Sequence, residues 1–299
     1  MFRNNSEDRN EYCKISYQYS HGGIFKFGMA TPVWFVNLIK IFFPFRKKIA
    51  SLSQNLWVKK IMDDFLFKGD AMVILHKDRL VIHENIEPPQ STVLPSSIVH
   101  HFIDQANHLW IMNHCLCREG DDCQDYPHDL GCLFMGEAVL GINTRLGHLA
   151  TRAEAHAHIQ RAQDLGLVHL IGRNKLDTLW MGVGPGDQLM TVCNCCPCCC
   201  LFKILPDLHP ELSASVSGMP GVKVYVNGNC ISCGRCIREQ ICFVNAIRME
   251  GDRVIIGDDC RSCGRCVEFC RQKAILVEFS EQNYIHQTIK TIEDNVKVN

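Results

Sequence analysis

The cysteine content of this 299-residue chain, 19 residues, constrains its fold more than any other feature. The cysteines are clustered: four lie in residues 115–132, six in 193–200 and eight in 230–270, and only Cys13 stands alone. Small secreted proteins spread their cysteines through a short disulfide-linked chain, and an odd number argues weakly against a closed disulfide framework. The polar N-terminal residues lack the apolar segment of a secretory signal, so we expect a cytoplasmic location, where clustered thiols more often bind metal. The clustering therefore predicts a metal protein.

Composition and charge narrow the class of protein. Hydrophobic residues make up 46% of the chain and charged residues 21%, which supplies enough apolar material for a core and argues against disorder. The net charge of −1 gives no sign of a nucleic-acid-binding surface, so no nucleic-acid partner is expected. The length suggests one large domain or two of ordinary size.

The first segment, residues 1–89, contains an apolar run at residues 33–43 that predicts a helix. Thr31 can cap this helix, Pro32 fits its first turn and Pro44 helps to end it. The run is shorter than the ~20 residues that span a bilayer. The favoured interpretation is a helix packed in this chain or against a partner subunit. The alternative is peripheral membrane contact through residues 33–45, because the basic residues 46–48 suit anionic headgroups. Two short strands, 71–75 and 80–82, are expected next, and Pro88-Pro89 marks a boundary.

The second segment, residues 90–215, has a pattern that is mainly helical. Thr151 and Glu154 have capping-box spacing ahead of a helix that Gly166 ends. His156 and His158 lie two residues apart on this helix, so they do not share a face and are interpreted as ordinary surface or boundary histidines. Prolines and serines between residues 201 and 221 predict a linker with little regular structure.

An internal repeat occupies the third segment, residues 216–280. Residues 229–237, Asn-Cys-Ile-Ser-Cys-Gly-Arg-Cys-Ile, recur thirty positions later as residues 259–267, Asp-Cys-Arg-Ser-Cys-Gly-Arg-Cys-Val. A fourth cysteine follows each copy, Cys242 and Cys270, ahead of a short apolar run. The last segment, residues 281–299, predicts an amphipathic helix that Ser280 can cap. Its apolar stripe, which would pack against the core or a partner, consists of Ile285, Ile289, Ile292 and Val296.

Each Cys-x2-Cys-x2-Cys run puts three thiolates on one tight loop, as three irons of a cubane require, and a fourth thiolate must come from elsewhere. On these motifs residues 223–279 resemble a bacterial-type ferredoxin with two [4Fe–4S] clusters. The resemblance implies a pseudo-twofold α+β unit with short strands before and after each cysteine run. It also implies that one cluster is held by Cys230, Cys233, Cys236 and Cys270, and the other by Cys260, Cys263, Cys266 and Cys242.

Two features depart from that family. Phe243 and Arg271 stand where proline usually follows the fourth cysteine, and five residues separate Cys236 from Cys242 where three are usual. The longer spacing would change the environment of the second cluster, but it leaves the number of ligands intact. Structural zinc is the alternative for the repeat, yet zinc sites use two pairs of thiolates and rarely need a third cysteine two residues on. Iron–sulfur clusters are therefore the favoured interpretation.

The two upstream cysteine groups supply ten further candidate metal ligands. These are Cys115, Cys117, Cys123, Cys132, Cys193, Cys195, Cys196, Cys198, Cys199 and Cys200. They suffice for two four-thiolate clusters with two thiols left over. Neighbouring cysteines have diverging side chains, so they would serve different metals or include non-ligands. The arrangement is similar to cysteine-rich modules that precede ferredoxin domains in some anaerobe proteins, a resemblance that implies no particular activity.

Three interpretations of the upstream cysteines remain open. The favoured one is one or two further iron–sulfur clusters that extend an electron path. The second is an unusual cluster with an open coordination position, near His114, His128 or Arg118, where a small substrate is reduced. The third is a zinc site or a thiol relay. Arg118 would stabilise a reduced cluster by offsetting its charge, or would form an ordinary surface ion pair.

The sequence therefore predicts an α+β protein with mainly helical N-terminal and middle regions and a ferredoxin-like domain after them. It contains no Walker-type phosphate loop, strand-linked Gly-x-Gly-x-x-Gly or Gly-x-Ser-x-Gly elbow, so electrons must come from and go to other proteins or one small substrate. The favoured function is a cytoplasmic multi-cluster electron carrier that relays low-potential electrons as a subunit of a larger anaerobic redox complex, with redox proteins as its partners. The alternative is a reductase or activating-complex component whose upstream cysteine module is catalytic. No catalytic residue is assigned.

Overall fold

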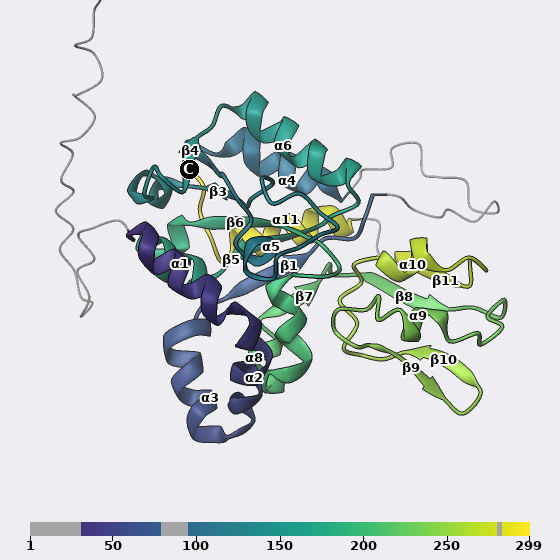
Figure 1. Ribbon diagram of the computed structural model, residues 1–299. Coiled ribbons are helices and arrows are strands. Elements are labelled where there is room, and N and C mark those ends of the chain that lie inside the picture. Colours follow the sequence, from purple (N-terminus) through teal and green to yellow (C-terminus); the bar gives the residue numbers. More distant parts are fainter. Residues whose placement is uncertain (1–30, 79–94, 280–282) are drawn as a thin grey trace, which may run out of the picture.

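The computed structural model describes residues 31–78, 95–279 and 283–299 and shows an α+β protein (Figure 1). Four features named above lie outside the described residues: Cys13, the predicted strand 80–82, the boundary at Pro88-Pro89 and the predicted cap Ser280. Within the described part, a large mixed sheet and two small two-stranded ribbons account for the strands.

A seven-stranded sheet with the order β4-β2-β3-β6-β5-β1-β7 forms the centre of the molecule. Its strands are β1 (Ala71–Ile74), β2 (Leu109–Met112), β3 (Leu133–Met135), β4 (Gly147–Leu149), β5 (Val168–Arg173), β6 (Met190–Cys195) and β7 (Val216–Gly218). All neighbouring strands are antiparallel except β1 and β7, which are parallel. β6, which carries Cys193 and Cys195, therefore lies in the middle of the sheet between β3 and β5.

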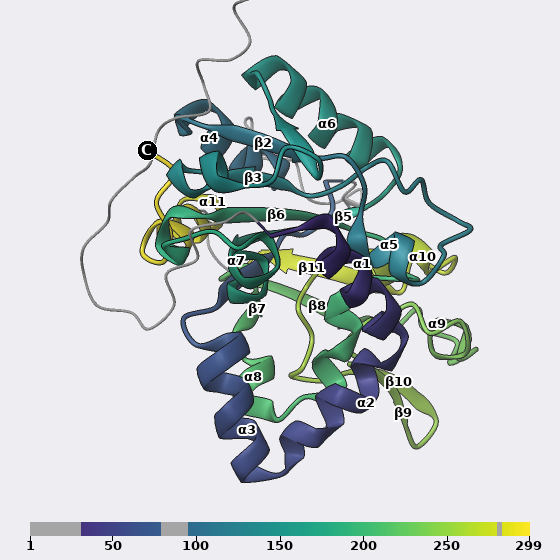
Figure 2. The same cartoon turned by 60° about the vertical axis from the view of Figure 1, so that its left-hand side comes forward.

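Helices α4 (Ser96–Gln105), α6 (Arg152–Asp164) and α11 (Tyr284–Glu293) cover one face of the sheet (Figures 1 and 2). Phe102 of α4, Ile159 of α6 and Ile292 of α11 belong to one apolar core with Ile171 and Val192 of the sheet. The stripe predicted for residues 281–299 thus packs inside this chain, since Ile285, Ile289 and Val296 join the same core.

The capping box predicted at the start of α6 is confirmed. The Thr151 hydroxyl accepts a hydrogen bond from the Glu154 backbone N–H at 3.2 Å, and the Glu154 carboxylate accepts one from the Thr151 N–H at 2.8 Å. His156 and His158 point to different partners, as expected: His156 bonds to His100 and Asp104, whereas His158 donates to the Gly131 carbonyl.

A row of short helices precedes β1 and lies toward the opposite face of the sheet. They are α1 (Val33–Phe42), η2 (Phe43–Phe45), α2 (Arg46–Ser51), η3 (Leu52–Gln54), α3 (Leu56–Met62) and η4 (Asp63–Phe67). The helix predicted at residues 33–43 is confirmed, although Pro32 rather than Thr31 occupies the N-cap position. Phe43 and Ala50 pack with Ile74 and Leu170 of the sheet.

The prediction of a mainly helical middle region missed the main sheet, although helices cover more of this region than strands do. Residues 90–215 contribute five of the seven strands of the main sheet, β2 to β6, besides α4, α6 and several short helices. These short helices are α5 (Leu116–Gly120), η5 (Glu137–Gly141), α7 (Lys175–Met181) and η6 (Gly186–Gln188). The strands are three to six residues long, and every residue of β2 and β3 is buried, so they lack the alternation that reveals a half-exposed strand.

The linker predicted between residues 201 and 221 was wrong. This segment forms η7 (Leu201–Asp207), α8 (Pro210–Ser213) and strand β7, which pairs with β1. Leu205, Leu208 and Leu212 are buried in the same core as Phe43. The prolines fit here because one begins α8 and another lies in the irregular turns of η7.

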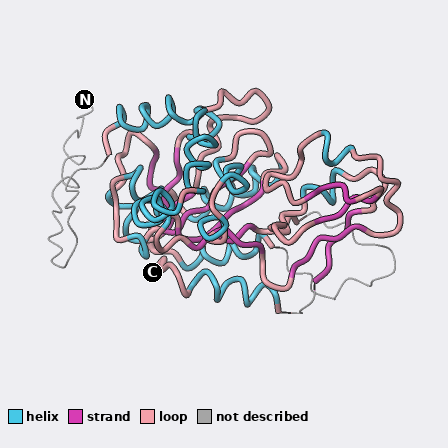
Figure 3. Tube along the Cα trace, turned by 90° about the horizontal axis from the view of Figure 1, so that it is seen from below, coloured by secondary structure: helices cyan, strands magenta, loops and turns pink. Residues whose placement is uncertain are grey.

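The sequence repeat folds into two antiparallel ribbons, with a short helix that begins one residue before the third cysteine of each Cys-x2-Cys-x2-Cys run (Figure 3). The first copy contains β8 (Val222–Val226), α9 (Arg235–Arg238) and β9 (Ile247–Glu250), and the second contains β10 (Arg253–Ile256), α10 (Arg265–Phe269) and β11 (Ile275–Phe279). β8 pairs with β11, and β9 pairs with β10. A strand therefore stands before and after each cysteine run, and the outermost strands of the repeat pair with each other.

Candidate metal centres

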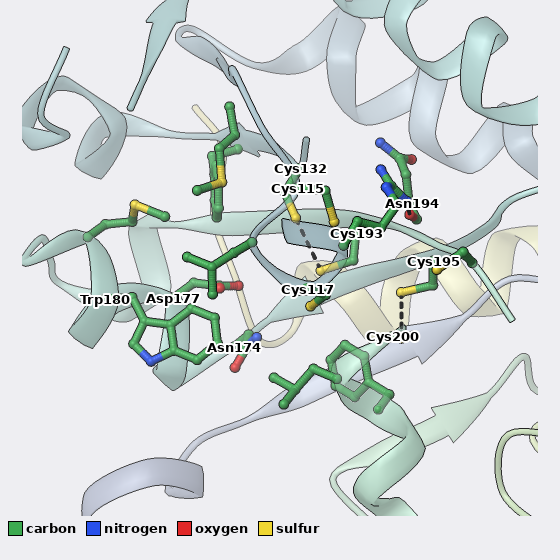
Figure 4. Close-up of a pocket in the computed structure, with 18 residues that line it drawn as sticks. Cys115, Cys117, Cys132, Asn174, Asp177, Trp180, Cys193, Asn194, Cys195 and Cys200 are labelled. Carbon is green, nitrogen blue, oxygen red and sulfur yellow. Dashed lines mark hydrogen bonds between the residues drawn. The ribbon is translucent and has the colours of Figure 1, made fainter. Parts of the chain in front are cut away.

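The ten upstream thiols separate into a group of six and a group of four. Seven cysteines line a cavity of about 40 Å³ (Figure 4). One of them, Cys196, belongs to the group of four, and the other six are Cys115, Cys117, Cys132, Cys193, Cys195 and Cys200. Cys193 and Cys195 reach it because alternate residues of β6 share a face. Cys115 and Cys117 come from the start of α5, and Cys132 comes from the residue before β3. We call this the six-thiol cavity.

The thiols of the six-thiol cavity are arranged as three pairs, two of which are joined by a further thiol hydrogen bond between Cys193 and Cys195. Cys195 and Cys200 have their Sγ atoms 2.9 Å apart, and those of Cys132 and Cys193 are 3.7 Å apart. Cys115 and Cys117 are hydrogen-bonded through their thiols. Because the pairs approach the cavity from different elements, the site offers soft ligands from several directions, as a metal cofactor with more than one metal ion requires.

Hydrogen bonds between the thiols lower the pKa of some of them and raise the pKa of others. Bonds from Cys193 and Cys200 hold the pKa of Cys195 well below its usual value. A bond from Cys117 lowers the pKa of Cys115 to about 7, although burial opposes the shift. Cys115 and Cys195 therefore lose their protons more readily than the thiols that bond to them, which favours metal binding through these two sulfurs.

Arg118 supplies positive charge beside these thiolates. The side chain is fully buried, and its guanidinium donates hydrogen bonds to the carbonyls of Asn194, at 2.9 Å, and Leu130. Burial opposes its charge, but the thiolates of Cys115 and Cys196 raise its pKa. The surface ion pair considered for Arg118 is therefore wrong: this cation is held inside the protein between the two upstream thiol groups.

The remaining upstream thiols, those of Cys123, Cys196, Cys198 and Cys199, form a compact quartet. Their Sγ atoms all lie within 4.8 Å of one another. Cys123 comes from the loop after α5, and the other three come from the turn between β6 and η7. The four thiols could hold a metal ion.

Adjacent cysteines do diverge as expected from the sequence. Cys195 forms thiol hydrogen bonds with Cys193 and Cys200, whereas Cys196, which also lines the cavity, belongs to the compact quartet. In the same way, Cys200 pairs with Cys195 while Cys199 turns to Cys123. The histidines near these groups are not aimed at them as ligands: His128 bonds to the Cys123 carbonyl at 2.8 Å, and the exposed His114 lies beside Glu119.

No family model, curated protein or solved structure matches this chain. A proposal about function therefore depends on the residues and geometry of the chain itself.

The eight thiols of the repeat fall into two groups that mix the copies. Burial raises the pKa of Cys236, and the nearby thiols of Cys233, Cys230 and Cys270 raise it further. Burial likewise raises the pKa of Cys266, followed by Cys263, Cys260 and Cys242. Each group contains three thiols of one copy and the fourth of the other. We call the group of Cys230, Cys233, Cys236 and Cys270 the outer quartet, and the group of Cys242, Cys260, Cys263 and Cys266 the inner quartet.

The inner quartet lies against the upstream module, whereas the outer quartet faces away from it. Cys242, Cys260 and Cys263 pack on the apolar core that contains Cys195 and Cys200 of the six-thiol cavity. In the outer quartet, Cys233 is exposed to solvent. The inner quartet is therefore the part of the repeat that packs against the core around the six-thiol cavity.

Arg265 connects the inner quartet to the six-thiol cavity. It follows Cys263 by two residues, is buried, and donates a hydrogen bond from Nη2 to the Cys195 carbonyl at 2.5 Å. Its guanidinium carbon lies 5.4 Å from the centre of the Phe243 ring. The sequence motif contains this arginine in both copies, so only the tertiary structure singles out Arg265.

The residues after β1 hold the loop of the inner quartet in place. His76 is buried and donates from Nδ1 to the Ser262 carbonyl at 2.7 Å, and the Lys77 N–H donates to the Cys263 carbonyl at 3.2 Å. Lys77 also forms an ion pair with Glu268. These contacts were not predicted from the sequence, in which His76 and Lys77 indicate only a turn between two strands.

Asp177 is another candidate functional residue that was not predicted from the sequence. It lines the six-thiol cavity, is buried, and accepts a hydrogen bond from the Thr191 hydroxyl at 2.8 Å. Burial raises the pKa of this carboxyl to about 6. A carboxyl that gains or loses its proton near neutral pH beside a metal-binding cavity is a candidate proton donor or acceptor.

Proposed function

We propose that this chain is an iron–sulfur electron-transfer protein whose repeat region is a ferredoxin-like unit with two [4Fe–4S] clusters. The outer quartet, Cys230, Cys233, Cys236 and Cys270, would hold one cluster, and the inner quartet, Cys260, Cys263, Cys266 and Cys242, would hold the other. The observation that carries the proposal is the grouping of the thiols. The fourth thiol of each group comes from the other copy, as in two-cluster ferredoxins.

The spacing of the thiols supports a cluster rather than a single ion at each quartet. A tetrahedral zinc site with bonds of about 2.3 Å brings its four sulfurs to about 3.8 Å from one another. Among the described residues, the compact quartet is the one set of three or more candidate ligands within 4.8 Å. The repeat thiols do not form such a set, which suits a cofactor in which each thiolate binds its own iron.

The arrangement of the quartets suggests the direction of the electron path. A redox partner protein would dock at the outer quartet, where Cys233 is exposed, and the inner quartet would pass electrons on to a further cluster in the six-thiol cavity. Arg118 and Arg265 would offset the negative charge of that cluster and its thiolates. Such a path has separate positions for electron entry and exit, which suits a subunit of a larger complex.

One observation favours a second candidate function. The six-thiol cavity contains the buried carboxyl of Asp177, whose raised pKa allows it to carry a proton near neutral pH. Under this alternative the cavity holds a catalytic iron–sulfur centre that reduces a small substrate, and Asp177 supplies a proton. The chain would then be a reductase or an activating-complex component.

Metal analysis of the anaerobically purified chain tests the main proposal. Two repeat clusters require about eight iron and eight acid-labile sulfide per chain, and a cluster in the six-thiol cavity raises both to about twelve. A value near four or below, or zinc in place of iron in the repeat, would contradict it. Electron paramagnetic resonance of the reduced chain then separates carrier from enzyme: a signal that shifts on addition of a small molecule, and shifts differently in Asp177→Asn, supports the catalytic alternative.

A further inference from the structure

The compact quartet differs from the other thiol groups in how closely its sulfurs approach. All four Sγ atoms lie within 4.8 Å of one another, and those of Cys123 and Cys198 are 3.3 Å apart. Among the described residues, no other set of three or more candidate ligand atoms meets this criterion. A single tetrahedral ion with metal–sulfur bonds of about 2.3 Å needs sulfurs about 3.8 Å apart. The compact quartet has the size for one ion.

The surroundings of the compact quartet fit a closed metal site. Leu130, Ala162 and Leu167 pack around the thiols. The Cys199 N–H donates to the Cys196 sulfur at 3.3 Å, and such a bond orients a thiolate ligand and reduces its charge. Lys203 donates to the Cys198 carbonyl at 3.1 Å, which places a cation beside the group. Four protein ligands fill a tetrahedral coordination sphere, so no position remains for a substrate.

We propose that Cys123, Cys196, Cys198 and Cys199 bind one Zn²⁺ ion as a structural site. The ion joins the loop after α5 to the turn between β6 and η7. That turn continues directly into Cys195 on one side and Cys200 on the other, which both face the six-thiol cavity. The zinc site therefore fixes the chain segment that presents these two cavity thiols. This inference does not depend on the clusters proposed for the repeat.

X-ray absorption at the zinc edge, measured on the unmodified chain purified anaerobically, tests the site directly. We expect one zinc per chain with four sulfur neighbours at about 2.3 Å. Absence of zinc, or nitrogen and oxygen neighbours in place of sulfur, would overturn the proposal. Because this measurement needs no variant, it decides the question even if a substitution prevents folding.

A pair of variants assigns the zinc to this quartet. Cys123→Ser should release its zinc to a colorimetric chelator while the iron content stays unchanged, and the matched variant Cys132→Ser, in the six-thiol cavity, should keep its zinc. A loss of about four iron from Cys123→Ser, without zinc in the unmodified chain, would show a cubane here and overturn the inference. An iron content below about eight per chain, together with one zinc per chain, would contradict the proposed function but not the zinc site.

An independent observation concerns the outward side of α1, α2 and α3. Among the described residues, every large hydrophobic side chain that is more than half exposed lies between Trp34 and Phe65, except Leu149 and Ile231. Trp57 is 81% exposed. Soluble monomers rarely expose so many large apolar side chains together, and such surfaces mark a membrane or protein contact. We call residues Trp34–Phe65 of this side the apolar face.

Helical spacing groups these side chains along one side of each helix. Trp34, Leu38, Ile41 and Phe45 follow one another at three- and four-residue steps, and Trp57, Ile61 and Phe65 do so along α3 and η4. Between them, Val36, Phe43 and Ala50 recur every seven residues and are buried against the rest of the chain. One side of these helices thus serves the core, and the other is left uncovered.

The charges on the same helices indicate what covers the apolar face. Lys47, Lys48, Lys60 and Lys68 are exposed, whereas Asp64 is the one exposed acidic residue among residues 31–70. Aromatic side chains with neighbouring lysines are typical of helices that lie in the interface of an anionic membrane. Among the described residues, no helix is long and apolar enough to cross a bilayer. We infer that the apolar face lies flat on the surface of an anionic lipid bilayer.

Sedimentation with lipid vesicles tests this inference. The full chain should sediment with vesicles that contain phosphatidylglycerol and much less with phosphatidylcholine alone, and the double variant W57S/I61S should lose most of the binding. Ile231→Ser removes a side chain that is 65% exposed on the repeat and should bind as the unmodified chain does. Equal loss in both variants, or no sedimentation with either lipid, would overturn the inference. A stable dimer that only W57S/I61S dissociates would instead assign the face to a second copy of the chain.

Discussion

The two copies of the repeat have the same cysteine spacing but different surroundings. In the first copy, Cys233 is exposed, and a Cβ added at Gly234 would meet only the end of the Arg238 side chain, at 3.4 Å. In the second copy, a Cβ added at Gly264 would lie 2.4 Å from the His76 ring. The Cys-x2-Cys-x2-Cys loop of the second copy therefore packs against the upstream module, whereas that of the first copy does not; the first copy meets the upstream core only after this loop, at Phe243, Val244 and Ala246.

This difference shows that ligand spacing and cluster role have separate origins. The spacing belongs to a nine-residue motif that can form the same loop twice. The role depends on which copy meets residues from β1 and from the cysteine-rich segment 193–200. Substitutions at equivalent positions of the two copies can therefore distinguish effects of the motif, which both copies share, from effects of the surrounding residues, which differ.

The largest expected effects come from removing one ligand of each quartet. Cys233→Ser should cost about four iron and leave the upstream signals unchanged, because the outer quartet does not touch the six-thiol cavity. Cys263→Ser should also cost about four iron, and in addition the upstream centre should no longer be reduced by a protein donor that enters at the outer quartet. Iron analysis and electron paramagnetic resonance of the reduced chains measure both effects. Loss of the upstream signals in Cys233→Ser would refute the separation of the two quartets.

The equivalent glycines should differ next. Both have positive φ, 64° at Gly234 and 80° at Gly264, so alanine costs about 1 kcal/mol at either position. Gly264→Ala must also displace the buried His76 ring, which adds roughly 1–3 kcal/mol. Anaerobic denaturant unfolding of the two variants checks the difference. Equal losses would mean that the second copy is no more tightly packed than the first.

The equivalent arginines give a smaller contrast. Arg265→Met leaves the Cys195 carbonyl without its charged donor and should lower the free energy of unfolding by about 2–3 kcal/mol. Arg235 lies over the Phe269 ring, with 4.8 Å from its guanidinium carbon to the ring centre, and Arg235→Met should cost less than about 1 kcal/mol. Arg265→Lys keeps the charge and should recover part of the loss. The same unfolding experiment applies, and an Arg235→Met variant as unstable as Arg265→Met would argue against the contact with Cys195.

The smallest contrast is expected at the serines. The Ser262 hydroxyl is buried and donates to the Val222 carbonyl at 2.7 Å, so Ser262→Ala should cost about 1 kcal/mol. Ser232 is only half-buried, and its replacement by alanine should change the free energy of unfolding by less than about 0.5 kcal/mol. Thermal unfolding under anaerobic conditions resolves a difference of this size in the midpoint temperature.

Features that depend on neighbouring residues were predictable from the sequence. The capping box of α6 and the helix after Pro32 were located correctly, because caps and apolar runs act within a few residues. The main sheet was missed. Its middle strands are short and buried on both faces, and β6 carries Cys193, Asn194 and Cys195 where a strand pattern would need apolar residues. These strands could not be predicted from local patterns, because their partners lie far away along the chain.

The thiols of the candidate sites likewise have some features that were predictable from local sequence and others that depend on tertiary packing. The sequence alone determined the two Cys-x2-Cys-x2-Cys loops and the expectation that adjacent cysteines diverge, since both depend on local backbone geometry. Only the tertiary structure decided that Cys123 joins Cys196, Cys198 and Cys199, that six other thiols share one cavity, and that Arg265 rather than Arg235 reaches Cys195. These groupings form between segments many residues apart, and long-range packing of the sheet and its loops brings them together.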